Sequence, residues 1–161
     1  MSETAATKPA FRESMQNRRC LIPADGFYEW AKIGKKEKQP YNFSMANDSI
    51  FAFAGLWDRW KDPDGKQILS CTILTTKPNP LVADIHDRMP AILRPDDYDL
   101  WLDPGITDPA RIADLLAPFD AQLMKKYPVS TRVNSVKNDD AECAKAIDLA
   151  DARSGQQMCP R

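Results

Sequence analysis

The first half of the chain is a succession of apolar, β-rich segments separated by short turns, and this pattern constrains the fold more than any other feature. The segments are CLIPA, GFYEWAK, PYNFSM, IFAFAGLW and QILSCTILTT. Turn-forming residues separate them at Asp25-Gly26, at Asn47-Asp48 and between Pro63 and Gly65. The pattern predicts a meander of mostly antiparallel strands.

The second half changes to short helices that begin at proline residues. Asn79 is a candidate cap before Pro80, and a second helix is predicted to start at Pro95. The segment TDPARIADLLAPF predicts the clearest helix, with its cap at Thr107 or Asp108. The segments MPAIL and KKYPVSTRVN predict two further strands. The fold class is therefore α+β, with a curved antiparallel sheet or partly closed barrel and helices packed around it.

The length of 161 residues predicts a single domain over residues 1–150, with 151–161 as a disordered tail. No apolar run approaches the roughly 20 residues that a membrane span needs, and the N-terminus lacks the pattern of a signal peptide. We expect a protein of the cytoplasm. The formal net charge of −1 gives no global attraction to nucleic acid, so any site for a polyanion must be local.

The cysteine and histidine content argues against a metal site. The chain has one histidine, and its four cysteines lack the paired spacings of a zinc site or a redox dithiol; they are Cys20, Cys71, Cys143 and Cys159. We expect ordinary reduced cysteines, no metal and no cofactor.

The segment GFYEWA carries a candidate catalytic carboxylate. Strand alternation puts Phe27, Glu29 and Ala31 on one face and Tyr28 and Trp30 on the other. If Phe27 faces the core, Glu29 faces it too, and a carboxylate in an apolar site has a raised pKa that suits acid/base work. The alternative is an edge-strand glutamate that faces water.

The segment ADIHDRMPAIL holds the only histidine, His86. Imidazole can both give and take a proton near neutral pH, and Arg88 can hold a phosphate in a fixed fork. Thr75 and Thr76 end a strand and can offer hydroxyl groups to a phosphate or a carbonyl. The alternative for each of these residues is an ordinary structural role.

Four motifs in this order, RRCLIPADGFYEW, FAFAGLW, SCTILTT and IHDRMPAIL, resemble the SOS-response-associated peptidase (SRAP) family. The likeness runs from Ser2 to about Asp140. It implies an SRAP-like fold and a partner, single-stranded DNA with abasic sites. Family members join covalently to the lesion through an N-terminal cysteine, which forms a thiazolidine with the sugar aldehyde. The word peptidase refers to the self-processing that frees this cysteine.

The resemblance also assigns roles to individual residues. It implies that Glu29 acts as acid/base near the α-amine and that His86 assists opening of the sugar ring by proton transfer. Arg88 would hold a DNA phosphate, and Thr75 or Thr76 would lie close to the lesion. Three further DNA contacts come from the aromatic and basic residues of the first quarter, namely Trp30, Arg18 and Arg19. A protein with this function is expected at the bacterial nucleoid when it is bound to DNA.

The start of the chain departs from the family pattern. The family begins Met-Cys-Gly-Arg, whereas this chain begins Met-Ser-Glu-Thr and has no cysteine before Cys20. We expect a chain truncated at its N-terminus, with the covalent step and self-processing impaired, and with exposed sheet edges through which copies self-associate. Whether the chain is an enzyme stays open. The alternatives are a non-covalent single-stranded DNA binding module and a Cys/His peptidase that uses Cys71 or Cys20.

Overall fold

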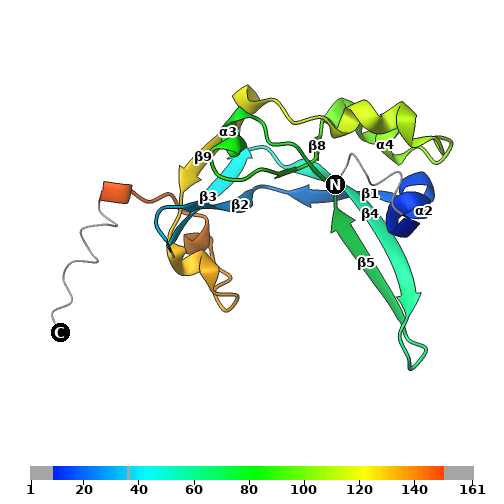
Figure 1. Cartoon of the computed structure of the whole chain (residues 1–161), viewed down its shortest axis with the longest axis horizontal. Coiled ribbons are helices and arrows are strands. Elements are labelled where there is room, and N and C mark those ends of the chain that lie inside the picture. The colour runs from blue at the N-terminus through cyan, green and yellow to red at the C-terminus, as the bar shows by residue number, and fades with distance from the viewer. Residues whose placement is uncertain (1–8, 36, 151–161) are drawn as a thin grey trace.

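The computed structural model describes residues 9–35 and 37–150, and its strands form separate antiparallel sheets (Figure 1). The first sheet has the order β1-β4-β5, with β8 paired to β4. Its strands are β1 (Arg19–Ala24), β4 (Phe51–Lys61), β5 (Gln67–Ile73) and β8 (Ile92–Leu93). The second sheet has the order β2-β3-β9, formed by β2 (Phe27–Lys32), β3 (Lys38–Met45) and β9 (Met124–Pro128). A small ladder joins β6 (Thr75–Thr76) to β7 (Met89–Pro90).

The antiparallel α+β class is confirmed, but the simple meander is wrong. Consecutive strands β1 and β2 belong to different sheets, and so do β3 and β4. The Asp25-Gly26 step redirects the chain toward β3 and makes no hairpin with β1. A Cβ on Gly26 would lie 3.0 Å from the Phe43 carbonyl oxygen, so glycine permits this close approach. Among the described residues the sheets do not close into a barrel.

Two of the predicted helix starts are confirmed at their caps. The Asn79 side chain accepts the N–H groups of Leu81 and Val82, each at 3.1 Å, at the start of α3 (Pro80–Ala83). Asp108 accepts from Ala110 at the start of η2 (Pro109–Leu116), which is a 3₁₀ helix. The remaining short helical turns are η1 (Pro95–Asp97), α4 (Tyr98–Leu102), η3 (Ala121–Leu123), η4 (Thr131–Asn134) and η5 (Ala141–Cys143). Helix α2 (Pro9–Asn17) was not predicted.

The buried side chains form two clusters at the two ends of the molecule. The helix-side core lies where α2, α4 and η2 meet the first sheet, and its buried members include Met15, Leu56, Trp101 and Ile112. The site-side core lies between the second sheet and α3, and it includes Phe43, Phe53, Val82 and Met89. Figure 1 shows α2 and α4 at one end of the first sheet and β2, β3 and β9 at the other.

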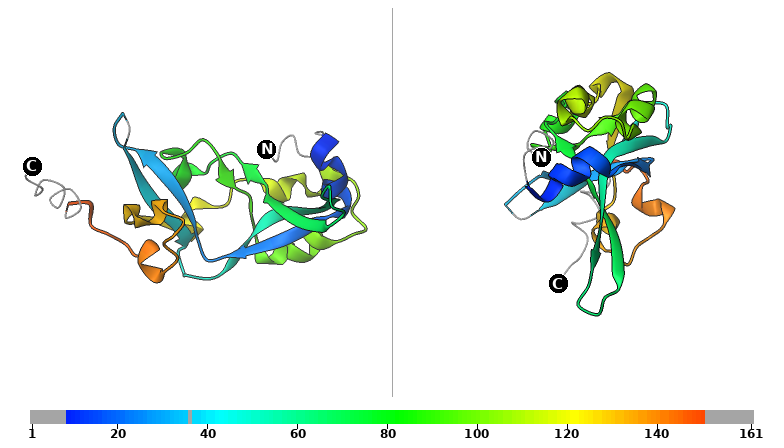
Figure 2. Two further views of the ribbon diagram at one scale, coloured as in Figure 1. Left: turned by 90° about the horizontal axis from the view of Figure 1, so that it is seen from below. Right: turned by 90° about the vertical axis from the view of Figure 1, so that its right-hand side faces the viewer.

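The outer halves of β4 and β5 form an arm that stands away from both cores (Figures 1 and 2). Residues 58–61 of β4 and 69–71 of β5 are exposed. The single domain over residues 1–150 stays a prediction, and the predicted tail at 151–161 lies outside the described residues. Within the described part of the chain, every helix is too short or too polar to span a bilayer.

Candidate functional site

Glu29 lies on the face of β2 that packs against the site-side core. Phe27, on the same face, stacks on Phe43 with ring centroids 5.1 Å apart and meets Phe53 edge-on at 6.0 Å. Tyr41 is the cross-strand neighbour of Glu29 on β3. Burial raises the pKa of Glu29, while the nearby His86 lowers it and Asp87 raises it further. The carboxyl group therefore lies within electrostatic reach of His86 and Asp87.

The loop of His86 is fixed at both ends by buried side chains. On one side Val82 of α3 is fully buried, and on the other side Met89 of β7 is 1% exposed. The His86 N–H donates to the Val82 carbonyl oxygen at 3.0 Å, which continues the turn of α3. Phe27 packs against the same cluster, so the hydrophobic contacts that fold these segments also bring Glu29 and His86 together.

The His86 ring is exposed, and its Nδ1 lies against the backbone of Arg88. The Arg88 N–H donates to Nδ1 at 3.0 Å, an arrangement that leaves the proton of the neutral ring on Nε2. The Arg88 carbonyl oxygen also lies 3.0 Å from Nδ1, and an Asp87 carboxylate oxygen lies 3.4 Å away, so a protonated Nδ1 has acceptors. No residue of the described chain hydrogen-bonds to Nε2.

Arg88 is held against Thr75 by the β6–β7 ladder. Thr75 pairs with Pro90 and Thr76 with Met89 in that ladder. An Arg88 Nη2–H donates to the Thr75 carbonyl oxygen at 2.5 Å, and the Thr75 hydroxyl lies 3.4 Å away. We call the group formed by Glu29, His86, Asp87, Arg88 and Thr75 the Glu29–His86 site.

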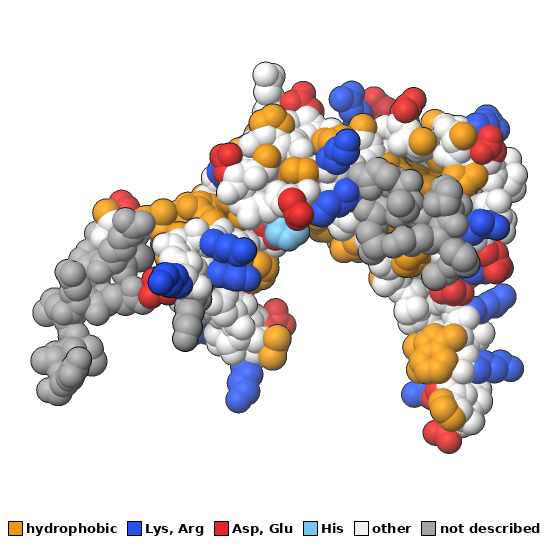
Figure 3. All heavy atoms as spheres, viewed as in Figure 1, with side chains coloured by type: hydrophobic (Ala, Val, Ile, Leu, Met, Phe, Trp, Pro, Cys, Tyr) orange, Lys and Arg blue, Asp and Glu red, His pale blue; other side chains and the backbone are white. Residues whose placement is uncertain are grey.

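Figure 3 shows the single histidine on an open face, with acidic and basic side chains beside it. Two charged residues of this region were missed as candidates. Asp87 follows the histidine directly, and its position in the motif was the available signal. Lys126 of β9 shares the sheet face of Phe43, and its Nζ donates to the Leu81 carbonyl oxygen at 3.0 Å and lies 3.7 Å from Asp84. Its only sequence signal was the basic pair that opens the last strand.

The structure places Trp30 apart from the Glu29–His86 site. Alternation along β2 puts its ring on the opposite face, beside Tyr28 at a centroid distance of 6.4 Å. Its Nε1–H donates to the Asn134 side chain at 2.7 Å, which ties β2 to η4. The proposed contact of Trp30 with DNA stays a prediction, but it would involve a different surface.

Arg18 and Arg19 also lie away from the site, where β1 meets α2 and α4. Arg18 forms an ion pair with Glu13 at 2.7 Å and another with Asp58 at 3.4 Å. The Arg19 guanidinium donates to five backbone carbonyl oxygens, at Met15, Gln16, Trp101, Asp103 and Ile106. These bonds engage Nε–H, both Nη1–H groups and one Nη2–H, so most of the guanidinium has a structural role. The proposed contact of Arg19 with DNA stays a prediction.

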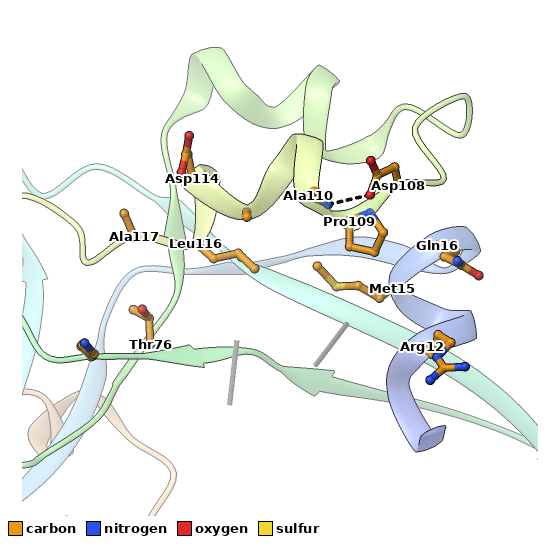
Figure 4. A pocket seen from close by; sticks show the side chains of 12 residues that line it. Arg12, Met15, Gln16, Thr76, Asp108, Pro109, Ala110, Asp114, Leu116 and Ala117 are labelled. Carbon is orange, nitrogen blue, oxygen red and sulfur yellow. Dashed lines mark hydrogen bonds between the residues drawn. The ribbon is translucent and has the colours of Figure 1, made fainter. Parts of the chain in front are cut away.

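Thr76 is separated from Thr75 because it points into a cavity on the other side of the ladder. The cavity has a volume of about 710 Å³ and lies between α2 and η2 (Figure 4). Met15, Pro109 and Leu116 give it apolar walls. Thr76 is 4% exposed, so of the two threonines only Thr75 joins the Glu29–His86 site.

Cys20 and Cys71, the two candidate nucleophiles, lie on strands of the first sheet and not in the loop of His86. Burial raises the pKa of the Cys20 thiol, which is the opposite of what activates a nucleophile. Cys71 is exposed on the arm. Within the described chain neither thiol hydrogen-bonds to His86, and no group of three histidine, cysteine or carboxylate side chains is arranged to hold a metal ion. The geometry gives the Cys/His peptidase no catalytic pair.

Comparisons with known proteins match almost the whole chain. Residues 1–136 match the family described as SOS response associated peptidase (SRAP). The chain is 48% identical over 141 residues to "Abasic site processing protein YoqW" of Bacillus subtilis (strain 168), covering 88% of this chain and 63% of that protein. It is 36% identical over 168 residues to "Abasic site processing protein HMCES" of Xenopus tropicalis, covering 92% of this chain and 49% of that protein.

Solved structures share the fold. The crystal structure of a protein from Bacteroides thetaiotaomicron matches with a TM-score of 0.82 and 34% identity, over 91% of this chain and 64% of that one. A protein from Bordetella bronchiseptica matches with a TM-score of 0.70 and 33% identity, over 80% of this chain and 63% of that one. The chain thus spans less than two thirds of the length of these relatives.

Proposed function

Because the chain belongs to the SRAP family, we propose that it recognises abasic sites in single-stranded DNA and that the damaged sugar binds at the Glu29–His86 site. The observation that carries the proposal is that a half-buried carboxyl group lies within electrostatic reach of an exposed imidazole. The relatives that bear the name abasic site processing protein support the choice of lesion.

The reaction that Glu29 and His86 would catalyse is the opening of the sugar ring. In the closed hemiacetal form, the C1′–O4′ bond breaks when O4′ gains a proton and the C1′ hydroxyl loses one. His86 Nε2–H is the donor to O4′, and Glu29 is the acceptor that takes the hydroxyl proton. The raised pKa of Glu29 strengthens it as a base and lets it return the proton. The product is an aldehyde, the form that an amine can attack.

The remaining residues of the site hold the DNA strand. Arg88 offers its guanidinium to the phosphate next to the lesion, while its bond to the Thr75 carbonyl fixes its direction. Lys126 adds a second positive charge on the same side of the second sheet. A protein with this substrate acts in the cytoplasm, at the nucleoid of a bacterial cell. The covalent thiazolidine step remains a family expectation, since it needs a cysteine at the N-terminus.

The experiment measures ring opening directly. A single-stranded oligonucleotide with one natural abasic site is mixed with a fluorescent alkoxyamine, which captures the open aldehyde. We expect the chain to accelerate capture, and we expect Glu29→Gln and His86→Ala to abolish most of the acceleration. Glu142→Gln is the matched control, because Glu142 is an exposed glutamate of η5 whose ion pair among the described residues is with Lys145.

Binding is followed in parallel by fluorescence anisotropy. An oligonucleotide with an intact base and one with a tetrahydrofuran lesion, which has no C1′ hydroxyl, separate recognition of the gap from ring opening. Equal affinity for the intact and abasic strands, together with unaccelerated capture, would overturn the proposal. A denaturing gel reports whether any covalent product forms.

A further inference from the structure

The outer edge of β5 is unlike the other outer strands of the two sheets. β1 carries Arg19 and Pro23, β2 carries Glu29 and Lys32, and β9 carries Lys125, Lys126 and Pro128. Charged residues and proline on an outer strand discourage pairing with another chain. The sequence of β5, QILSCTI, has no charged residue, no proline and no glycine. β8 is also an outer strand without charge or proline, but it has two residues and both are buried, so among the longer outer strands of the two sheets β5 alone has none of these protections.

The arm that carries this edge is also poorly covered. Trp60 of β4 is 53% exposed and Leu69 of β5 is 71% exposed, on opposite faces of the arm. A two-stranded ribbon is marginally stable in water on its own. Within the described residues β5 pairs only with β4, so its outer N–H and C=O groups are open to a further strand.

We propose that two copies of this chain associate through β5, which pairs antiparallel with the partner's β5 about a two-fold axis at Ser70. This centre pairs all seven residues of the strand, so that Ser70 lies opposite the partner's Ser70 and Leu69 lies opposite the partner's Cys71. The two arms then form one four-stranded sheet, β4-β5-β5-β4. A symmetric contact of this kind closes on itself and gives a dimer.

The absence of charge is what favours a second copy over other occupants. When a strand pairs with its own copy about a two-fold axis, a charged residue on the axis faces the same charge and charges next to the axis lie close to their copies, a clash that an uncharged strand avoids. An acidic or basic peptide would find no opposite charge on β5. Pairing removes Leu69 from water against the partner's Cys71 and completes the open ladder.

A charge exchange at Ser70 tests the proposal and its register. Sedimentation velocity in reducing buffer, over a concentration series, is expected to show the unaltered chain approaching twice its 18.2 kDa mass. Ser70→Lys and Ser70→Asp each place two like charges at the axis, and each is expected to raise the dimer dissociation constant at least tenfold. An equimolar mixture of the two variants pairs opposite charges and is expected to restore the dimer.

Val136→Lys and Val136→Asp are matched controls, because Val136 is fully exposed in the loop after η4. Circular dichroism checks that each variant folds. Hydrogen exchange on the unaltered chain gives a test without variants, since β5 amides should exchange more slowly as concentration rises. A monomer at every concentration, a dimer that survives both Ser70 variants, or a mixture that stays monomeric would overturn the proposal.

Discussion

The two cores of the molecule use their charged side chains in opposite ways. In the helix-side core, Arg19 lies 5.7 Å from the centre of the Trp101 ring and its donors reach five backbone carbonyl oxygens. At the edge of the site-side core, Glu29 is half-buried and forms no ion pair with a described residue, and His86 Nε2 has no hydrogen-bond partner among them. The comparison indicates that the hydrogen bonds a charged side chain already makes, and not its charge or burial alone, decide whether it has a structural role or can react with a ligand.

The largest effect expected from this contrast is the loss of stability in Arg19→Ala. The substitution leaves carbonyl groups of α2, α4 and the following loop without their donor, so we expect the free energy of unfolding to fall by about 3 kcal/mol or more. Urea denaturation measures it. Arg18→Ala is the control, with an expected loss under about 1 kcal/mol, because both of its ion-pair partners are exposed acids. Equal losses in the two variants would contradict a structural role specific to Arg19.

The next effect falls on chemistry and not on stability. His86→Ala is expected to slow alkoxyamine capture of the abasic aldehyde by about 10²-fold, the usual range for loss of a general acid. Because the ring is exposed, the midpoint of urea unfolding should stay within the error of the unaltered chain. A variant that unfolds more easily, or that captures at the original rate, would show that His86 supports the loop rather than the reaction.

The contrast also explains what the sequence could and could not predict. Asn79 before Pro80, and Asp108 before Pro109, act on their own neighbours, and both helix starts were predicted correctly. The partners of Arg19 at Trp101, Asp103 and Ile106 lie more than 80 residues away, so a local pattern gave no sign of them. The switch of the chain from the first sheet to the second at Gly26 depends on contacts with β3 and was missed for the same reason.

In the candidate site, too, local patterns could be predicted from the sequence and contacts between distant segments could not. Alternation along one strand placed Glu29 on the face of Phe27, and the structure bears this out. Thr75 and Thr76 lie in different environments, and so do Trp30 and Glu29. In each pair the difference depends on which elements pack against the two faces of the strand. That information lies in η2, η4 and α2, far along the chain.

A smaller effect is expected for Arg88→Ala, which tests the boundary of the site. Removal of one phosphate contact should weaken binding to single-stranded DNA by about tenfold and lower the slope of log affinity against log salt by about one. Fluorescence anisotropy across a salt series measures both quantities. Arg111→Ala, an exposed arginine of η2, is the matched control and should leave the slope unchanged. An unchanged slope in Arg88→Ala would move the DNA contact away from the Glu29–His86 site.

The smallest effect concerns the stability cost of Glu29 itself. Burial raises the pKa of this carboxyl group in the folded chain above its ordinary value of 4.5, so the folded state keeps the proton at a pH where the unfolded state has lost it. The free energy of unfolding therefore falls as pH rises from about 4.5 through the raised pKa, and the loss is complete above it. Urea unfolding of the unaltered chain and of Glu29→Gln, measured between about pH 4 and about pH 8, isolates this contribution. Glu29→Gln should gain stability relative to the unaltered chain as pH rises, whereas Glu142→Gln should run parallel to it. The stability difference between Glu29→Gln and the unaltered chain could instead stay constant with pH or change in the opposite direction. Either result would mean that the fold stabilises the ionised carboxylate, as it does the Arg19 guanidinium, and would argue against Glu29 as an acid/base group.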